Sequence, residues 1–345
     1  MATERPRRRP SMADVGRASG VSAQTVSRYY TGGYVSPATR DLIERAVGEL
    51  GYQHNKLPSI LRAQHTDAIG FLSMGPLNYG NSGILTGISR AARAEGQTLL
   101  TTQLDLDPES PSSQREFTRT LESFLSVRVD GIVVGTPYVG LEKLLEAVGR
   151  TVPIVSLSEV TYEGIDTVHA DSYGAARLAV RHLIELGHRR ILHLAGPGNR
   201  NESGERVRGY RDELSAAGIA ELPIVRCDEW DAVSGASGAE RADPSTFTAV
   251  FSANDELALG FMSVMRSRGL VAPRDYSIAG VDDMPEARFF APSLTSARLD
   301  FEELGETALR MILGRIHDVE QTPREVIPAV LSVRESTGAP AAATT

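Results

Sequence analysis

Cysteine is almost absent from this chain of 345 residues: Cys227 is the only one. A single thiol excludes an internal disulfide and an all-cysteine metal site, so we expect Cys227 to be a buried spectator. Aromatic residues are also scarce, at 6%, whereas hydrophobic residues as a whole reach 41%. That composition is ordinary for a globular protein and predicts a core packed mainly by aliphatic side chains. The length suggests two or three domains.

Long apolar runs are missing as well. No stretch of the sequence approaches the ~20 residues needed to span a bilayer, so we expect no membrane partner. Residues 1–10 carry four arginines, but no apolar stretch follows them. They do not resemble a secretory signal, and we expect the protein to act in the cytoplasm. Their proline and arginine content predicts a disordered basic arm, either a solvated tail or an arm that adds phosphate contacts.

Negative charge dominates the chain as a whole, with a formal net charge of −8, but it is unevenly distributed. Residues 1–62 contain ten Lys/Arg and five Asp/Glu, a balance of +5. The remaining residues contain 26 basic and 39 acidic side chains, a balance of −13. A small basic module on a large acidic body suggests a polyanionic partner for the first part only.

Three short helices are predicted within residues 11–53. Ser11, Ser22 and Ser36 are each suited to cap a helix N-terminus, and glycines at 20, 32–33 and 51 end the three helices. A helix, a tight glycine turn and a second helix that begins with small polar residues are the sequence form of a helix-turn-helix. The residues expected to face the core are Met12, Val15, Ala18, Val26, Tyr30, Leu42, Ile43, Ala46, Val47 and Leu50.

The second of these helices, residues 23–30, exposes side chains suited to reading DNA. Gln24 can pair with an adenine edge and Arg28 with guanine or phosphate, whereas Ala23 is limited to apolar contact, for instance with a thymine methyl group. The alternative is an ordinary solvated helix surface. The residues that we expect to contact DNA from this helix and its flanks are Ser22, Ala23, Gln24, Thr25, Ser27, Arg28, Thr31 and Tyr34.

From Asp67 onward, short apolar runs alternate with amphipathic helical stretches. Such alternation, with near-continuous apolar strands, predicts parallel sheets covered by helices on both faces. The series is too long for one sheet, so we expect two doubly wound lobes with a ligand cleft between them, at the carboxyl ends of the strands.

The expected boundaries follow from these patterns. A helix-turn-helix headpiece covers 11–53, a linker 54–66, a ligand-binding body 67–337, and a disordered tail 338–345. Within the body, we expect the N-lobe at about 67–166 and 297–325, and the C-lobe at about 167–296 and 326–337. The tail has no leucine heptad, so no tetramerising coiled coil is expected.

Several separated motifs resemble the lac-repressor (LacI/GalR) family, from about residue 12 to residue 338. They are DVGRASGVSAQTVSRYY (14–30), VSPATR (35–40), ELGYQHN (49–55), HLIELGHRRILHLAGP (182–197), RVRGY (206–210), FSANDELALG (251–260), GVDD (280–283), PSLTSARLDFEELG (292–305) and VRESTG (333–338). The whole series in this order is specific, whereas a lone helix-turn-helix fits many regulators. The resemblance implies an all-α headpiece and a two-lobed α/β body of the periplasmic-binding-protein type. It also implies a homodimeric transcriptional repressor that binds a near-palindromic operator.

The resemblance further implies a hinge helix near residues 56–62. Leu61 holds the position of a leucine that wedges into the minor groove, and Asn55 is expected at the DNA as well. The alternative for Leu61 is an ordinary apolar contact. His54 stands where a proline is common, and Pro58 where a small residue is usual. Proline is tolerated in the first turn of a helix, so a hinge that begins at residue 56 or 57 accommodates Pro58, whereas an earlier start is weakened by it.

The family resemblance also places an effector site in the cleft. Arg206 lies where the family binds sugar hydroxyls or a carboxylate with a guanidinium fork. Asn254 and Asp282 match further polar contacts at strand ends, with capping of the next turn or helix as their alternative role. Trp230 and Phe301 fall where aromatic faces stack on a ligand. The remaining expected effector contacts are Ser73, Asn78, Tyr79, Ser158 and His169.

A sugar effector is favoured, with a purine or a phosphorylated sugar acting as corepressor as the alternatives. We expect no cofactor, because the chain has no phosphate-cradling G-x-x-x-x-G-K-[ST] loop. It has no serine nucleophile elbow, and its seven histidines show no metal-ligand spacing, so we expect neither catalytic nor metal-binding residues. A sugar-binding protein that does not bind DNA would lack the headpiece. Induction and corepression are the same coupling with opposite sign, and the sequence does not fix that sign.

Overall fold

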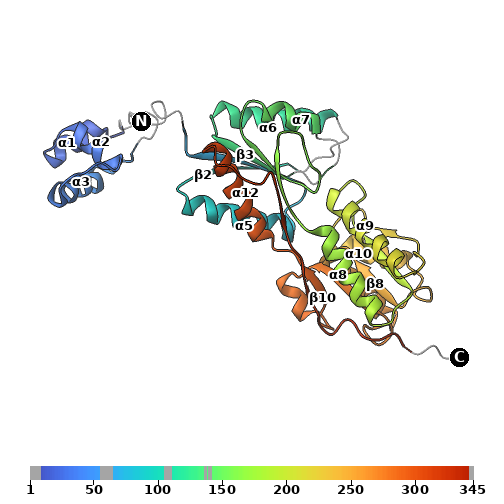
Figure 1. The fold of residues 1–345 in the computed structure, drawn as a ribbon. Helices are drawn as coiled ribbons and strands as arrows, with labels where there is room; N and C mark the ends of the chain where they lie inside the picture. Colours follow the sequence, from blue (N-terminus) through green and yellow to red (C-terminus); the bar gives the residue numbers. More distant parts are fainter. Residues whose placement is uncertain (1–8, 55–64, 105–110, 136–137, 139–141, 342–345) are drawn as a thin grey trace, which may run out of the picture. The chain divides into compact units, whose positions relative to one another are not determined.

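The computed structural model describes residues 9–54, 65–104, 111–135, 138 and 142–341. It divides into two compact units, the headpiece unit Met1–His65 and the body unit Thr66–Thr345 (Figure 1). Asn55, Pro58 and Leu61 of the expected hinge lie outside the described residues, as do residues 1–8 of the expected arm and 342–345 of the expected tail.

The headpiece contains the three predicted helices, α1 (Met12–Ser19), α2 (Ala23–Tyr30) and α3 (Pro37–Leu50). Ser11 and Asp14 form a capping box: the Asp14 N–H donates to Ser11 Oγ at 3.3 Å, and the Ser11 N–H donates to the Asp14 carboxylate at 2.8 Å. The turn between α1 and α2 is tight, because a Cβ atom on Gly16 would lie 2.8 Å from the Val21 carbonyl oxygen. Gly20 completes this turn with a φ of 69°, which favours glycine.

A small core holds the three helices together. Val15, Val26, Ile43, Ala46 and Tyr52 are buried and contact one another. The expectation that Ala18, Leu42 and Leu50 face this core is wrong, because all three are exposed. Ser19 is buried in place of Ala18, and its hydroxyl donates to the Val15 carbonyl at 2.7 Å. Leu42 and Leu50 lie on a flank of α3 that no other described part of the headpiece covers.

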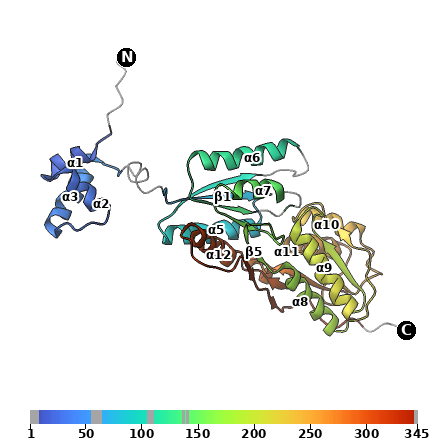
Figure 2. The same ribbon diagram turned by 45° about the horizontal axis from the view of Figure 1, so that its top comes forward.

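The first sheet of the body has the strand order β11-β5-β4-β3-β1-β2, with every pair parallel. Its strands are β1 (Ala68–Met74), β2 (Thr98–Leu104), β3 (Gly131–Gly135), β4 (Ile154–Leu157), β5 (Asp166–Ala170) and β11 (Arg324–Ile327). Helices α5 (Tyr79–Ala94) and α12 (Phe301–Ile316) pack on one face, and α6 (Pro111–Ser126) and α7 (Glu142–Gly149) on the other (Figures 1 and 2).

The second sheet has the order β12-β10-β9-β8-β6-β7, and only the β10–β12 pair is antiparallel among its described pairings. Its strands are β6 (Ile191–Ala195), β7 (Val225–Arg226), β8 (Ala249–Ser252), β9 (Ser277–Asp282), β10 (Thr295–Arg298) and β12 (Val330–Ser332). Helices α8 (Ser172–Glu185) and α9 (Asn201–Ala216) cover one face, and α10 (Ala232–Arg241) and α11 (Asp255–Ser267) the other (Figure 2). A short 3-10 helix, η1 (Pro285–Phe289), follows β9.

These two sheets confirm the predicted fold of two doubly wound lobes, but the expected division of the lobes needs correction. Strand β5 pairs with β4 and β11 in the first sheet, so residues 167–170 belong to the N-lobe and not to the C-lobe. Strand β11 places residues 326–327 in the N-lobe as well. The chain crosses between the lobes after β5, after β10 and after β11, so each lobe is built from separated segments.

Two further expectations concern the whole chain. Cys227 is buried as predicted, and burial raises the pKa of its thiol to about 11. Within the described ranges, no helix combines the length and apolarity that crossing a membrane requires.

The headpiece core yields a stability prediction. Ile43→Ala should lower the free energy of headpiece unfolding by about 2–5 kcal/mol, because it removes a fully buried side chain and leaves a cavity. Leu42→Ala, at the exposed neighbouring position, should change it by only about 0.5 kcal/mol. Hydrogen exchange of the full-length chain, followed by mass spectrometry of headpiece peptides, measures both changes. Equal effects of the two substitutions would contradict this core.

Candidate functional site

Helix α2 presents a polar face to solvent, as the sequence predicts. Ala23, Gln24 and Arg28 are exposed, and Tyr34 in the following loop is 84% exposed. The aliphatic stem of Arg28 packs over Gly33, where a Cβ atom would overlap it. The guanidinium of Arg28 is therefore extended over the loop while remaining open to a partner.

Three of the hydroxyl groups expected at the DNA, those of Ser22, Thr25 and Thr31, are engaged within the headpiece. Ser22 Oγ accepts a hydrogen bond from the Thr25 N–H at 3.0 Å and lies 2.9 Å from Thr25 Oγ1, so these two residues cap α2. Thr31 Oγ1 donates to the Ser27 carbonyl at 3.0 Å and closes the end of the same helix. Ser22, Thr25, Ser27 and Thr31 therefore fix the geometry of α2, whereas Gln24 and Arg28 provide its free polar groups.

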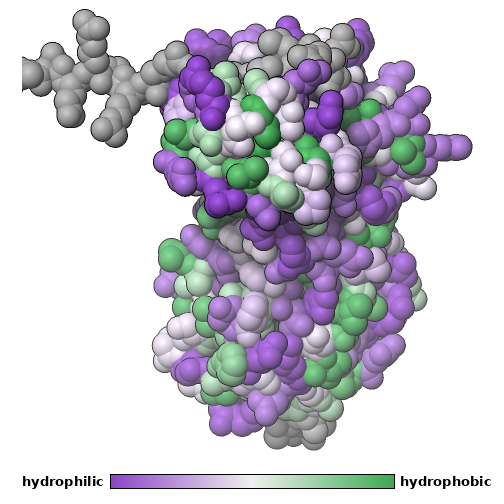
Figure 3. Space-filling model, turned by 90° about the vertical axis from the view of Figure 1, so that its left-hand side faces the viewer, coloured by the Kyte–Doolittle hydropathy of each residue, from purple (hydrophilic) through white to green (hydrophobic). Residues whose placement is uncertain are grey.

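The body contains a pocket with about 860 Å³ of empty space, including the space at its open mouth. It lies where strands of both sheets end, at the carboxyl ends of β1, β4, β5 and β9. On the face of the molecule drawn in Figure 3, hydrophilic residues predominate and hydrophobic residues are scattered among them. Most of the pocket's polar and charged lining residues are buried or nearly so. The polar and charged residues that line the pocket are Asn78, Asn81, Ser158, Glu159, His169, Ser172, Arg200, Asn201, Glu202, Arg206, Asn254 and Asp282.

The structure brings eight of the ten expected effector residues together in this pocket. They are Asn78, Ser158, His169, Arg206, Trp230, Asn254, Asp282 and Phe301. Ser73 and Tyr79 do not line it: Ser73 is buried in β1, and the ring of Tyr79 lies edge-on to Phe301, with centroids 5.9 Å apart. Each is one residue away from a residue that does line the pocket.

The polar or charged lining residues absent from the expected set include Glu159, Arg200, Asn201 and Glu202. Glu159 directly follows Ser158 at the end of β4. The expectation that the cleft lies at the carboxyl ends of the strands therefore applied to Glu159 as well. The other three lie in the glycine-rich segment GPGNRNESG (196–204), whose position next to β6 marks it as an edge of the cleft.

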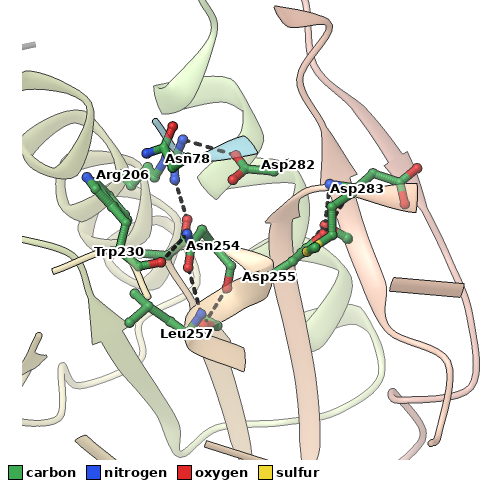
Figure 4. A network of polar contacts seen from close by, with 12 residues as sticks. Asn78, Arg206, Trp230, Asn254, Asp255, Leu257, Asp282 and Asp283 are labelled. Carbon is green, nitrogen blue, oxygen red and sulfur yellow. Dashed lines mark hydrogen bonds and ion pairs between the residues drawn. The ribbon is translucent and has the colours of Figure 1, made fainter. Parts of the chain in front are cut away.

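Arg206 organises one wall of the pocket from helix α9. Its guanidinium donates to the Ala253 carbonyl, lies 3.4 Å from the Asp282 carboxylate, and stands 5.1 Å from the centre of the Trp230 ring (Figure 4). Asp282 has a φ of 105°, which is strained for a residue with a side chain. Burial raises the pKa of Asp282 to about 7, and the charge of Arg206 opposes that rise.

Asn254 has the capping role that was the alternative in its sequence interpretation. Its Oδ1 accepts from the Leu257 N–H at 2.8 Å and caps α11, and its Nδ2 donates to the Trp230 carbonyl at 2.9 Å (Figure 4). The amide thus ties the start of α11 to the loop that carries the indole. Asn254 lines the pocket, and its described contacts show it as a residue that positions Trp230.

Glu159 and His169 form a close pair on the N-lobe side, with 3.2 Å between Oε2 and Nε2 and side chains only 10% and 8% exposed. Burial raises the pKa of Glu159 to about 8. Burial also lowers the pKa of His169, helped by the nearby charge of Arg324. Both shifts favour the uncharged form, so we describe the pair as two uncharged side chains in contact at pH 7 and not as an ion pair. The described residues contain no cluster of three or more His, Cys, Asp or Glu side chains able to hold a metal ion.

A helix-turn-helix with an open polar face, in one chain with a two-lobed body that encloses a polar pocket, defines a ligand-responsive DNA-binding regulator. The comparisons with known proteins agree. Residues 11–55 match the family model "Bacterial regulatory proteins, lacI family", and residues 180–337 match "Periplasmic binding protein-like domain". The HTH-type transcriptional regulator CelR of Thermobifida fusca is 32% identical over 350 residues, spanning 96% of this chain and 99% of CelR.

Solved structures give the same result. The crystal structure of the lac repressor dimer bound to operator and the anti-inducer ONPF has a TM-score of 0.86 at 27% identity, covering 96% of this chain and 100% of that one. A complex of the transcriptional regulator CelR with cellobiose has a TM-score of 0.70 at 29% identity, covering 95% and 100%. The chain belongs to the lacI family of bacterial regulatory proteins.

The raised pKa of Glu159 makes stability depend on pH. The folded chain holds a proton that the unfolded chain releases above about pH 4.5, so the free energy of unfolding should fall as pH rises from 4.5 to 8. Glu159→Gln mimics the protonated acid and should flatten this fall by up to about 1 kcal/mol per pH unit. Urea denaturation between pH 5 and 8.5 measures the slope. The exposed Glu163→Gln in the following loop is the control, and equal slopes in all three proteins would contradict the buried neutral Glu159.

Proposed function

We propose that this protein is a sequence-specific transcriptional repressor whose affinity for operator DNA is controlled by a sugar bound in the interlobe pocket. One observation carries the proposal: a single chain contains both the exposed Gln24 and Arg28 of α2 and the buried Arg206–Asp282 pair beside Trp230. The relatives found are regulators, and we assign the chain no enzymatic activity. Its site of action is the DNA of the cytoplasm.

The headpiece supports the DNA-binding half of the proposal. Capping by Ser22 leaves the first turn of α2 regular, with Ala23 and Gln24 at its exposed start. That turn is the part of a recognition helix that meets base edges in the major groove. A homodimer places two such helices in half-sites related by a two-fold axis, so the operator should be nearly palindromic. The similar lac repressor structure is a dimer on its operator.

The chemistry of the pocket supports a sugar. Each sugar hydroxyl group donates and accepts, and the pocket offers arginine donors together with carboxylate and amide acceptors. Trp230 and Phe301 supply apolar faces for the C–H surface of a ring. The similar CelR structure is a complex with cellobiose.

The location of the pocket supports control by closure of the lobes. Asn78, Ser158 and His169 come from the N-lobe, whereas Arg206 and Asp282 come from the C-lobe. A ligand that contacts both sets binds most tightly when the lobes are close, so it shifts the population toward that arrangement. The sign of the effect on DNA, induction or corepression, is decided by adding the effector to the protein–operator complex.

The recognition helix gives the first functional prediction. Selection from randomised duplex DNA should enrich a near-palindromic sequence that the chain binds with strong dependence on salt. Gln24→Ala combined with Arg28→Ala should weaken that binding at least about tenfold, because each good contact to a base edge contributes about 1–3 kcal/mol. Fluorescence anisotropy measures the affinity, and Arg211→Ala on the body is the charge-matched control. Failure to enrich any sequence, or unchanged affinity in the double variant, would refute DNA reading by α2.

The pocket gives the second functional prediction. Arg206→Ala should abolish the response of operator binding to whichever sugar of a screened panel alters it in the wild type. Arg206→Lys should reduce that response, because an ammonium group lacks the guanidinium fork. Both variants should bind operator without sugar within about threefold of the wild type, a change below 1 kcal/mol. The exposed Arg208→Ala on the same helix is the control. A normal sugar response in Arg206→Ala would contradict the assignment of this pocket as the effector site.

A further inference from the structure

A second arginine lines the pocket without an acceptor. Arg200 precedes α9, is only 6% exposed, and belongs to the C-lobe. Its guanidinium reaches the N-lobe, where it stacks on the Tyr138 ring at 3.8 Å and lies against Gly75. A Cβ atom on Gly75 would be 2.7 Å from Nη1, so the N-lobe fixes the position of this group.

Stacking on Tyr138 occupies a face of the guanidinium plane but none of its N–H groups, which point outward within that plane. Among the described residues, none accepts a hydrogen bond from the Arg200 side chain or forms an ion pair with it, and its buried Nε has no partner. Arg206 differs, because it has the Ala253 carbonyl and Asp282 as acceptors. A buried cation without hydrogen-bond acceptors is unfavourable. Arg200 obtains such acceptors only when something bound in the pocket supplies them.

The N-terminus of α9 adds to this positive site. Arg200 is its N-cap residue and makes no side-chain cap, and the next two residues, Asn201 and Glu202, line the pocket. The first turn of this 16-residue helix therefore brings its positive dipole end to the same place as the unmatched guanidinium.

The acidic neighbours do not neutralise Arg200. Burial raises the pKa of Glu159 to about 8, which favours its uncharged form at pH 7. Burial also raises the pKa of Glu202, and the charges of Arg200 and Arg206 oppose that rise. Asp282 is already paired with Arg206. Among the described lining residues, Arg200 is thus a cation that no carboxylate pairs with, and a single negative charge on a ligand would match it.

We propose that the effector is a sugar acid, a polyhydroxylated ligand with one carboxylate, and that Arg200 binds this carboxylate. The proposal rests on the proposed function, since it names the chemical class of the sugar in the same pocket. A carboxylate matches the planar donor edge of Arg200 and its single charge. A phosphate dianion would bring a second negative charge, and the other lining arginine, Arg206, is already paired with Asp282.

Matched pairs of sugars test this class directly. The full-length chain is titrated by calorimetry with D-glucose and D-glucuronate, D-galactose and D-galacturonate, and D-mannose and D-mannuronate, and also with glucose 6-phosphate and galactose 6-phosphate. Members of each pair differ only by a hydroxymethyl or carboxylate group. At least one acid should bind about tenfold or more tightly than its neutral parent and than the phosphates, a difference expected for one charge-assisted contact.

Variants of Arg200 connect that preference to one residue. Arg200→Gln should weaken binding of the preferred acid about 10- to 100-fold and change binding of its neutral parent by less than about threefold. Arg200→Lys should retain part of the preference because it keeps the charge. Arg211→Gln, exposed on the same helix and ion-paired with Glu221, is the matched control and should behave as the wild type.

Three outcomes of the titrations would overturn the proposal: neutral sugars bind as tightly as their acids, no acid in the panel binds, or phosphates bind more tightly than acids. A fourth outcome comes from the variants, namely that Arg200→Gln weakens binding of the acid and of its neutral parent by the same factor. The last would show that Arg200 is only a contact between the lobes. Failure of the proposed function is separate. It would appear as loss of sequence-specific DNA binding without ligand, or as sugar binding that leaves DNA binding unchanged.

Discussion

A guanidinium removed from water must find acceptors, and the C-lobe is arranged around that requirement at Arg206. The acceptors come from two different strand ends, the Ala253 carbonyl after β8 and the Asp282 carboxylate at the end of β9. Trp230 lies over the same group, and Asn254 holds the loop of that indole. The left-handed backbone at Asp282 persists because this network determines where its carboxylate must be. One buried cation therefore fixes helix α9 and two strand ends relative to one another.

Sequence patterns predicted the elements well where each element contains its own determinants. Serine caps and glycine stops located α1, α2 and α3, and apolar runs alternating with amphipathic stretches indicated parallel strands in both lobes. The errors concern long-range partners. Strand β5 has the same composition as a C-lobe strand, and only its pairing with β4 and β11 places it in the N-lobe. Leu42 and Leu50 have the periodicity of core residues, but the small headpiece has too few elements to cover them.

The candidate site shows a similar distinction between residues that the sequence indicated and residues that only the structure revealed. Residues that the family pattern marks, such as Arg206, Trp230 and Asp282, are in the pocket. Glu159 and Arg200 lie outside the family motifs found in the sequence, and their state depends on burial, which the sequence does not reveal. The two arginines illustrate the difference. Arg206 has hydrogen-bond acceptors within the protein and forms part of the pocket wall. Arg200 is held by the Tyr138 ring and Gly75 and has no acceptor among the described residues.

The crossings between the lobes determine when each part of the molecule can form during synthesis. The headpiece core is complete once Tyr52 has been made, and it needs nothing from the body. The N-lobe sheet requires β11, which ends at Ile327, and the C-lobe sheet requires β12, which ends at Ser332. Because domains fold as units while the chain emerges, the DNA-contacting helices can form long before either lobe is whole. A nascent chain thus acquires the means of binding DNA well before it acquires the means of being regulated.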